Sequence, residues 1–400
     1  MTGDGEKKGG WEDNRRPART QVPISEPILR WAMTRSGRGV DELQRTLPKL
    51  TKWLKGESRP SLPEVEKLAK ETSTPLGFFF LSKPPTEQLS IPHFRTFGNQ
   101  QSDQHPSPNL IETIQLMEQR QGWMREYLHE QGHKPLTFIH SANPGDKPEH
   151  VASEIKRTLG LSDTWASEQP NWTKALQELR IKIEETGILV FVNGIVGNNP
   201  HRKLEVTEFR GFVLVDDYAP LVFVNNADGK AAQMFTLAHE LVHIWFGKSA
   251  VFDLKELRPA DDAIERASNH VAAEFLIPAK QLHKLWPSIK DEPEPFLVIA
   301  QHFKVSELVA AYRTLNLGLI KNDEFSKFYH NYEREIRDTT KKSDGGGNFY
   351  ASQNLRIDHH FAMAVISATR EGRLLYRDAY KLTGLYGVTF ERYAKTLGLG

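Results

Sequence analysis

The chain has 400 residues, a charged content of 26% and a formal net charge of +1 at pH 7. This balance excludes a global attraction to nucleic acid or to membranes, so any basic surface must be local. The absence of cysteine excludes disulfides and limits a metal site to His, Asp and Glu ligands. The length predicts two or three domains, and the shortness of every apolar run predicts a soluble, cytoplasmic protein.

The N-terminal quarter is predicted to hold a tail, a small helical domain and a linker. Residues 1–22 mix both charge signs and have no apolar core, which indicates a disordered tail and not a secretory signal. Residues 23–85 contain four short helical patterns separated by Gly and Pro. The polar, proline-bearing stretch 86–110 is interpreted as a linker.

Capping residues indicate where the short N-terminal helices begin and end. Ser25 is the expected N-cap of the first helix, which should end at Gly37. The third helix is expected over residues 48–56, which start with Pro and end with Gly. Ser61 and Glu64 have the spacing of a capping box at the start of the fourth helix.

Residues 111–285 combine helical and strand patterns, with three period-two segments between stretches of helical periodicity. The expected helices are 111–131, 148–159, 172–186, 227–247 and 260–279, and the expected strands are 187–193, 209–217 and 220–226. The predicted fold class is therefore α+β and mostly helical, with a small three-stranded sheet packed on the helix 227–247. Residues 286–340 are interpreted as a helical extension and residues 341–400 as a C-terminal helical segment.

The segment FTLAHELVHIWFG, residues 235–247, contains an HExxH motif. Residues four apart share one face of a helix, so His239 and His243 present two imidazoles to one point. Glu240 lies about 100° around the helix, where it can reach a water at that point but is poorly placed as a ligand. Two His ligands and a Glu general base are the arrangement of helical HExxH zinc hydrolases. The apolar flanks predict a buried helix, in which unpartnered histidines would be costly.

A third protein ligand is required if one coordination position is to stay open for water. A carboxylate on the helix 260–279 is the best candidate, since Glu265 lies 22 residues after His243 and Asn269 follows one turn later on the same face. The alternatives on this segment, in decreasing order, are Glu274, His270 and the acidic pair Asp261 and Asp262. Each alternative also has an ordinary interpretation, as a helix charge or as a residue that only flanks the site.

The segments AAQMFTLAHELVHIWFG and ERASNHVAAEFLIP together resemble the ImmA/IrrE-type metallopeptidases, a gluzincin-like HExxH family. In that family the helix after HExxH carries a Glu, then an Asn four residues later, and then a small apolar run that ends in Leu-x-Pro. Glu265, Asn269 and Pro278 match this pattern, so the resemblance implies that Glu265 is the third zinc ligand. Ser268 stands where many members have Ala or Cys, which exchanges one small residue for another.

The resemblance covers most of residues 24–320 and is strongest over 208–280. The segments ILRWAMTRSGRGVDELQ and LTKWLKGESRPSLPEVEKLAKETSTPLGFFFLSKPP resemble an XRE-type helix-turn-helix. The resemblance thus implies an N-terminal helix-turn-helix bundle over 23–85 and a zincin-like metallopeptidase domain over 111–285. The last 80 residues resemble extensions of some long members, and no activity is assigned to them.

The family resemblance implies a zinc-dependent endopeptidase of regulatory type that acts on few substrates. Known members cleave a DNA-bound repressor and so switch on stress-response or mobile-element genes, and other long members resemble partners of toxin genes. We therefore expect Zn²⁺ as the cofactor, a DNA-binding repressor as the protein substrate, and a cognate toxin as a further partner. The alternative is a DNA-binding transcription regulator or antitoxin whose metal site is not proteolytic.

The third short helix and the turn after it carry the residues expected to contact DNA. Thr51 and Lys52 are the expected base readers, because a recognition helix places its N-terminal residues at base edges. Lys55 and Arg59 are expected at phosphates. The alternative is a small bundle used for protein contact, since basic residues on a solvated helix face are common.

The HExxH motif also predicts a mechanism, in which Glu240 is the general base that takes a proton from water and passes it to the leaving amine. The substrate is expected to lie extended along the strand edge near residues 209–216, as an added strand. His270 and Tyr218 lie near the segments from which an oxyanion stabiliser would come, but both are interpreted as surface polar residues. Asn269 and His270 are the residues expected to flank the zinc or the substrate.

Overall fold

The computed structural model describes residues 21–86, 93–94, 106–252, 263–339 and 356–399. The chain divides into two compact units, residues 1–88 with 104–108 and residues 89–103 with 109–400. We call the first the N-terminal unit and the second the large unit. The expected tail over residues 1–22 lies almost wholly outside the described residues.

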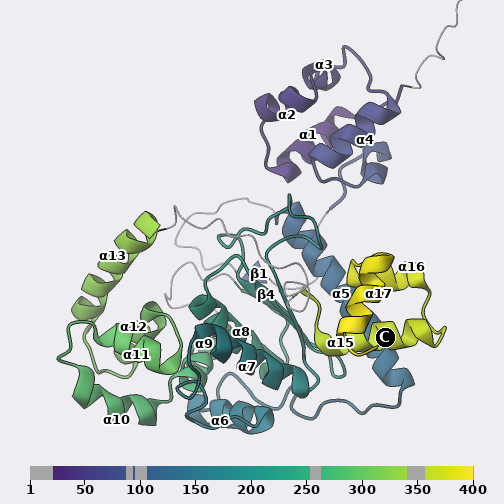
Figure 1. The fold of residues 1–400 in the computed structure, drawn as a ribbon. Helices are drawn as coiled ribbons and strands as arrows, with labels where there is room; N and C mark the ends of the chain where they lie inside the picture. The colour runs from purple at the N-terminus through teal and green to yellow at the C-terminus, as the bar shows by residue number, and fades with distance from the viewer. Residues whose placement is uncertain (1–20, 87–92, 95–105, 253–262, 340–355, 400) are drawn as a thin grey trace, which may run out of the picture. The chain divides into compact units, whose positions relative to one another are not determined.

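The N-terminal unit is a bundle of short helices whose ends follow the sequence signals (Figure 1). Its helices are α1 (Glu26–Ser36), α2 (Val40–Thr46), α3 (Leu50–Leu54) and α4 (Leu62–Glu71), followed by a 3₁₀ turn at Leu76–Phe80. Gly37 ends α1 with a φ of 67°, and the capping box of Ser61 and Glu64 is present. Ser25 occupies the N-cap of α1 without a capping hydrogen bond from its side chain. The helix α3 is shorter than expected, because residues 48 and 49 form the turn that follows α2.

The large unit is built on a mixed sheet that contains the three predicted strands. These are β2 (Leu189–Asn193), β3 (Gly211–Leu214) and β4 (Leu221–Asn225), and two short strands extend them, β1 (His93–Phe94) and β5 (Ala250–Phe252). The strand order is β1-β5-β3-β4-β2. The strand β2 runs parallel to β4, while β3 is antiparallel to both β4 and β5. The prediction of an α+β, mostly helical fold is confirmed.

The position of β3 contradicts one expectation, that a substrate strand adds along residues 209–216. Gly211 pairs with Val224 of β4 on one side and with Phe252 of β5 on the other. A strand with neighbours on both sides has no open edge for a further strand. The sequence did not reveal this arrangement, because β5 is too short to give a recognisable period-two pattern.

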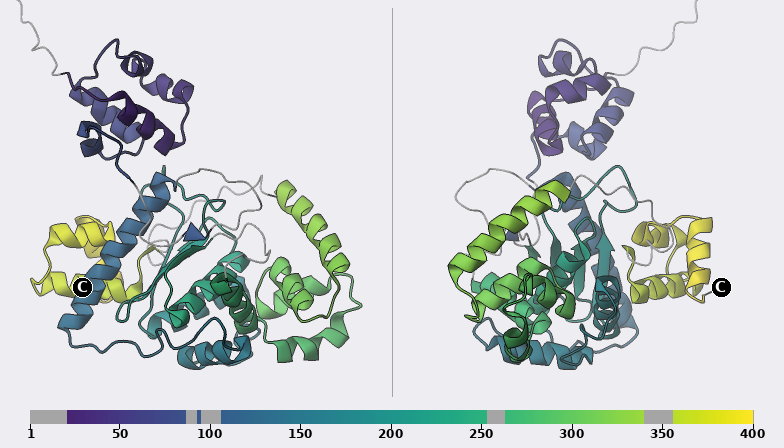
Figure 2. Two further views of the ribbon diagram at one scale, coloured as in Figure 1. Left: turned by 180° about the vertical axis from the view of Figure 1, so that it is seen from behind. Right: turned by 60° about the vertical axis from the view of Figure 1, so that its left-hand side comes forward.

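Helices cover both faces of the sheet (Figures 1 and 2). One face, with Val190, Val213 and Val222, packs against the core that contains α8. The other face, with Phe191 and Phe212, belongs to a second core. The core on the first face includes α6 (Pro148–Leu159), α7 (Trp172–Glu185), α8 (Lys230–Phe246) and α9 (Ala263–Leu276), and the core on the second includes α5 (Pro108–Glu130), α15 (His359–Arg370), α16 (Tyr376–Thr383) and α17 (Val388–Thr396). Because both faces are covered, every residue of β2, β3 and β4 is buried.

Further helices follow α9 along the chain and extend the large unit. They are α10 (Ala279–Ile289), α11 (Pro295–Phe303), α12 (Glu307–Asn316) and α13 (Asn322–Thr339). Ile299 of α11 and Ala310 of α12 belong to the same apolar core as α8. Among the described residues, no helix has the length and apolar character needed to cross a membrane.

A buried ion cluster attaches the C-terminal helices to the sheet. Asp358 caps α15 by accepting a hydrogen bond from the Phe361 amide at 2.9 Å, and it accepts another from the Val190 amide at 3.0 Å. Glu184 at the end of α7 receives a hydrogen bond from Arg180 at 2.6 Å and lies close enough to Asp358 to share a hydrogen bond with it. We call Arg180, Glu184 and Asp358 the docking cluster, since it joins α7, β2 and α15.

Candidate metal centre

The helix α8 is buried in the core of the large unit, and it carries the HExxH motif. Residues 233–246 are all buried, and Gly247 ends the helix with a φ of 64°. A helix that is apolar on every side packs inside a core. His239, Glu240 and His243 therefore leave the solvent together when this helix packs, with exposed fractions of 0%.

Three side chains from two helices converge on one point. The Nε2 atoms of His239 and His243 lie 3.0 Å apart. The Glu265 carboxylate of α9 places Oε2 at 3.1 Å from Nε2 of His239 and Oε1 at 3.2 Å from Nε2 of His243. We call these three residues the metal cluster, because a buried group of this kind could hold a metal ion.

The spacing of the metal cluster agrees with metal coordination. Two ligand atoms that each lie about 2.0–2.1 Å from a tetrahedral ion are about 3.3 Å from each other. The three contacts, at 3.0, 3.1 and 3.2 Å, are close to this separation. Among the residues that the structure describes, this is the one group of His, Asp and Glu atoms close enough to share an ion.

Glu240 lies beside the metal cluster without a partner of its own. Both carboxylate oxygens are buried, and neither has a hydrogen-bond partner within the described chain. Leaving a buried polar group unsatisfied costs about 1–3 kcal/mol, and more for a charged one. The Glu240 carboxylate is thus buried although it forms no hydrogen bond within the described chain, which is typical of a residue with a functional role.

Burial also determines the protonation of the site. It raises the pKa of Glu240 well above the usual value, and the Glu265 carboxylate raises it further. Burial lowers the pKa of His239, which favours the neutral imidazole that binds metals. Burial alone would raise the pKa of Glu265, but the neighbouring His239 and His243 lower it below its usual value.

Asn269, one turn after Glu265 on α9, fixes the orientation of His239. Its Oδ1 atom lies 3.0 Å from Nδ1 of His239. An amide oxygen only accepts hydrogen bonds, so Nδ1 carries the hydrogen and Nε2 keeps its lone pair for the metal cluster. Nδ1 of His243 has no such partner among the described residues.

Gly211 of β3 is a site residue that the sequence analysis did not single out. A Cβ at this position would lie 2.6 Å from Cγ2 of Thr236, 2.8 Å from the Phe223 carbonyl oxygen and 3.2 Å from Oε1 of Glu240. Only glycine therefore lets β3 lie this close to the HExxH turn of α8. A glycine within a strand pattern is the signal that indicates such a close approach.

The other candidate ligands lie elsewhere. Glu274 is buried in an ion pair with Arg313 and accepts a hydrogen bond from the Ala279 amide at 3.2 Å. Glu274 is therefore a buried residue with a structural role, whereas the sequence suggested a charge on the helix surface. His270 is exposed on α9, outside the metal cluster. Asp261 and Asp262 lie outside the described residues.

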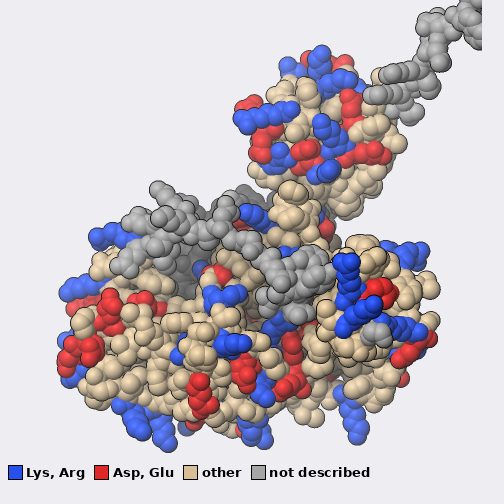
Figure 3. Space-filling view, in the orientation of Figure 1, with Lys and Arg blue, Asp and Glu red and all other residues tan. Residues whose placement is uncertain are grey.

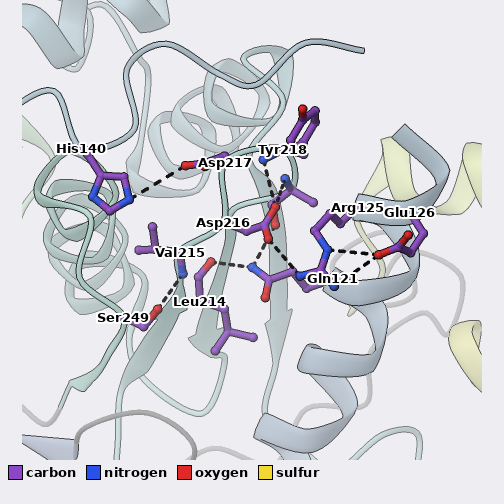
Figure 4. Close-up of polar contacts among 11 residues, drawn as sticks. Gln121, Arg125, Glu126, His140, Leu214, Val215, Asp216, Asp217, Tyr218 and Ser249 are labelled. Carbon is purple, nitrogen blue, oxygen red and sulfur yellow. Dashed lines mark hydrogen bonds and ion pairs between the residues drawn. The ribbon is translucent and has the colours of Figure 1, made fainter. Parts of the chain in front are cut away.

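Tyr218 belongs to the turn between β3 and β4 (Figure 4). Its amide donates to Oδ1 of Asp216 at 2.9 Å, and its ring lies 5.2 Å from that of His129. Arg125 of α5 binds the other oxygen of Asp216 at 3.3 Å. These contacts give Tyr218 a role in the turn, and none of them joins it to the metal cluster.

The residues expected to contact DNA lie on and after α3 of the N-terminal unit. Lys52, Lys55 and Arg59 are exposed, among charges of both signs (Figure 3). Thr51 is half-buried, and its hydroxyl accepts a hydrogen bond from the Gln44 amide of α2. Lys49 forms an ion pair with Glu64 at 3.0 Å, so this lysine is engaged within the unit.

The fold and the site together define a class of domain. A buried His-His-Glu group, with a further Glu in the HExxH helix and a small sheet against that helix, is the arrangement of metallopeptidase domains. Comparison with known proteins is more specific, since residues 183–315 match the family model Peptidase M78, described as the IrrE N-terminal-like domain. This match contains both α8 and α9, and it supports a peptidase of the ImmA/IrrE kind.

The comparisons add two further findings. Residues 357–396, which include α15, α16 and α17, match the model of a domain of unknown function. No curated protein matches the chain.

Proposed function

We propose that this chain is a zinc-dependent endopeptidase of regulatory type, which cleaves a DNA-binding repressor or a similar partner protein. The observation that carries the proposal is the buried metal cluster with the unpartnered Glu240 carboxylate beside it. A structural metal site does not need that carboxylate, whereas hydrolysis of a peptide bond needs a general base. The cytoplasmic setting would be a stress response, a mobile element or a toxin–antitoxin module.

The donor atoms of the metal cluster favour zinc. His239 and His243 offer imidazole nitrogens and Glu265 offers a carboxylate, a donor set that suits Zn²⁺ better than Ca²⁺ or Mg²⁺. Three protein ligands leave one position open, as in catalytic zinc sites. When bound there, Zn²⁺ supplies Lewis acidity, which lowers the pKa of a coordinated water to about 7 and polarises the scissile carbonyl.

The chain's own residues then perform the proton transfers and the positioning. Glu240 takes the proton from the attacking water and donates it to the leaving amine. Asn269 holds the His239 ring in the tautomer that presents Nε2 to the metal cluster. Gly211 allows the backbone of β3 to approach the HExxH turn that carries Glu240.

The N-terminal unit is proposed to bind DNA or the repressor. The helices α2 and α3 are joined by the turn 47–49, and the exposed basic residues Lys52, Lys55 and Arg59 follow in and after α3. Thr51 and Lys52 remain the proposed base readers, although the hydrogen bond from Gln44 engages the Thr51 hydroxyl. DNA binding through these residues would weaken steeply with salt, which a fluorescence anisotropy titration of a promoter fragment at 50 and 200 mM salt would measure.

The second candidate function is a DNA-binding regulator or antitoxin whose metal site is not proteolytic. The exposed basic residues around α3 favour it, because they serve binding and not hydrolysis. The unpartnered Glu240 favours the peptidase instead.

A cleavage assay distinguishes the two functions. The zinc-loaded chain would be incubated with each DNA-binding repressor that neighbouring genes encode, and fragments would be followed by mass spectrometry. The wild type should cut at one position, whereas Glu240→Gln should not cut at a measurable rate while it keeps its zinc. Normal cleavage by the Glu240→Gln chain would overturn the mechanism.

A further inference from the structure

A buried arginine of the large unit lacks a counter-charge. Arg120 of α5 is 4% exposed, and its guanidinium lies 4.9 Å from the ring centre of Phe191. Its Nε atom donates to the Leu382 carbonyl at 2.8 Å and its Nη1 atom to the Arg356 carbonyl at 3.4 Å. Within the described chain, no carboxylate forms an ion pair with it. A buried cation without an anion is costly, so this arrangement requires an explanation.

Arg120 faces a pocket whose wall holds a second arginine. The pocket has about 300 Å³ of empty space including its open mouth, and its enclosed part admits about one water-sized sphere. Its polar lining consists of Arg120, Arg356, Asn193, Asn198, Thr113 and Thr383. None of the described lining residues is acidic. The walls come from α5, the segment after β2 and the C-terminal segment, and none of them belongs to the metal cluster.

The amides and hydroxyls of this pocket are already engaged with the chain. Nδ2 of Asn193 donates to the Gly197 carbonyl and Nδ2 of Asn198 to the Gly384 carbonyl, both at 2.8 Å. The hydroxyls of Thr113 and Thr383 donate to carbonyls within their own helices, at 2.6 and 2.8 Å. Each amide keeps one further N–H, so the charged donors of the pocket are those of the two guanidinium groups.

Arg120 and Arg356 have more N–H donors than they have hydrogen bonds to acceptors of the described chain. A guanidinium has five N–H donors. The described contacts use two donor atoms of Arg120, and one of Arg356, which reaches Oδ1 of Asn198 at 3.5 Å. Two cations with spare donors around one small space form a fork that matches the oxygens of phosphate or carboxylate.

We propose that this pocket binds a small anion, a phosphate or carboxylate group, between Arg120 and Arg356. The anion supplies the counter-charge that Arg120 lacks and joins α5 to the C-terminal segment. The enclosed part has room for about one oxygen atom of the anion, so the rest of the anionic group and any uncharged part of the ligand lie in the open mouth. The site is independent of the proposed peptidase function, because it shares no residue with the metal cluster.

Calorimetric titration of the full chain with sodium phosphate, sodium acetate or sodium chloride, at equal ionic strength, tests this proposal. Saturable binding of phosphate or acetate at one site is expected, with a matching rise in the melting temperature. Binding of phosphate alone would assign the site to a phosphate-bearing ligand, and binding of both would assign it to small oxyanions in general. Arg356→Met and Arg120→Lys should each weaken binding about 10- to 100-fold, through loss of charge-assisted hydrogen bonds.

The control is Arg125→Met, which removes one positive charge from the same helix at an exposed position bound to Asp216. It should bind the anion as the wild type does. Arg356 is only half-buried, so its substitution keeps the test informative if the Arg120 variant folds poorly. Absence of saturable binding by the wild type, or equal weakening in all three variants, would overturn the proposal. A lower melting temperature in the Arg120 variant with unchanged anion binding would do so too.

Discussion

Two buried clusters of ionisable side chains in the described part of the large unit are satisfied to very different degrees. In the docking cluster, Asp358 accepts two backbone hydrogen bonds and Glu184 is bound by Arg180. In the metal cluster, donor atoms of three side chains lie 3.0–3.2 Å apart, and Glu240 has no hydrogen-bond partner among the described residues. A cluster whose polar atoms bind one another serves stability, whereas a buried carboxylate without a partner in the described chain is typical of a site for binding or chemistry.

The contrast has a clear energetic meaning. Removing Arg180 from the docking cluster should cost stability, because the carboxylates of Glu184 and Asp358 then stay buried without a cation. Removing Glu240 should cost activity and little stability, because that carboxylate has no hydrogen bond to lose. Measurements of unfolding and of cleavage on the same variants therefore separate the two roles.

Glu240→Gln should show the largest effect on activity. The variant keeps the shape of the side chain but cannot accept the proton, so peptide cleavage should fall by about 10²–10⁴-fold. Its free energy of unfolding in urea should be close to that of the wild type, since the Glu240 carboxylate has no hydrogen bond within the described chain to lose. A marked loss of stability in this variant would mean that Glu240 stabilises the fold, as the members of the docking cluster do.

Arg180→Met should have the largest effect on stability. It leaves Glu184 and Asp358 buried beside each other without a cation, at a cost of about 3–5 kcal/mol at pH 8. Urea unfolding measures this difference, and zinc content should remain unchanged because the metal cluster is not touched. An unfolding free energy within about 0.5 kcal/mol of the wild type would contradict a stabilising docking cluster.

The docking cluster should also make stability depend on pH. Burial, followed by the charge of Asp358, raises the pKa of Glu184 from 4.5 to about 7. A raised folded-state pKa means that the folded chain holds the proton more tightly. The resulting contribution is complete below about pH 4.5 and is lost as the pH rises to about 7. From pH 5 to pH 8 this group should remove on the order of 2–3 kcal/mol of stability.

Glu184→Gln isolates that pH effect, because glutamine cannot ionise. The free energies of unfolding of the variant and the wild type, measured from pH 5 to pH 8, should diverge in favour of the variant at the upper end. Parallel curves would show that Glu184 does not titrate in this range.

Asn269→Ala should have the smallest effect of these substitutions. Asn269 is not a member of the metal cluster but forms a hydrogen bond with one of its members, His239. The substitution removes the hydrogen bond that orients His239, so zinc affinity should fall about 10- to 100-fold. Competition with a chromogenic chelator measures the affinity. Asn269→Asp is the matched variant, since a carboxylate oxygen accepts the same hydrogen bond and should restore most of the binding. Equal affinities for wild type and Asn269→Ala would remove this residue from the site.

The sequence predicted the metal cluster better than the docking cluster, and the reason is sequence distance. His239 and His243 are four residues apart on one helix, and Glu265 and Asn269 have the same spacing on the next. Such spacings are fixed by helix geometry and can be read from the sequence. The choice of Glu265 over Glu274 came from family resemblance, and the structure adds that Glu274 is engaged with Arg313.

Contacts between distant segments gave no comparable signal. Asp358 binds the amide of Val190, 168 residues away, and Arg120 binds the carbonyl of Leu382, 262 residues away. Neither pairing follows from local periodicity. The strand β5 supplies only three residues, yet it decides that β3 is an interior strand. The local capping signals at Gly37 and Ser61 did predict the helix ends, because caps act within one turn.

The zinc content of the purified chain tests the central claim most directly. Elemental mass spectrometry should find about one zinc per wild-type chain, as expected for a single three-ligand site. Glu265→Ala should lose nearly all of it, while His270→Ala, which changes an exposed residue of the same helix, should retain it. A wild-type chain that binds no zinc, or a Glu265→Ala chain that binds as much as the wild type, would contradict the account.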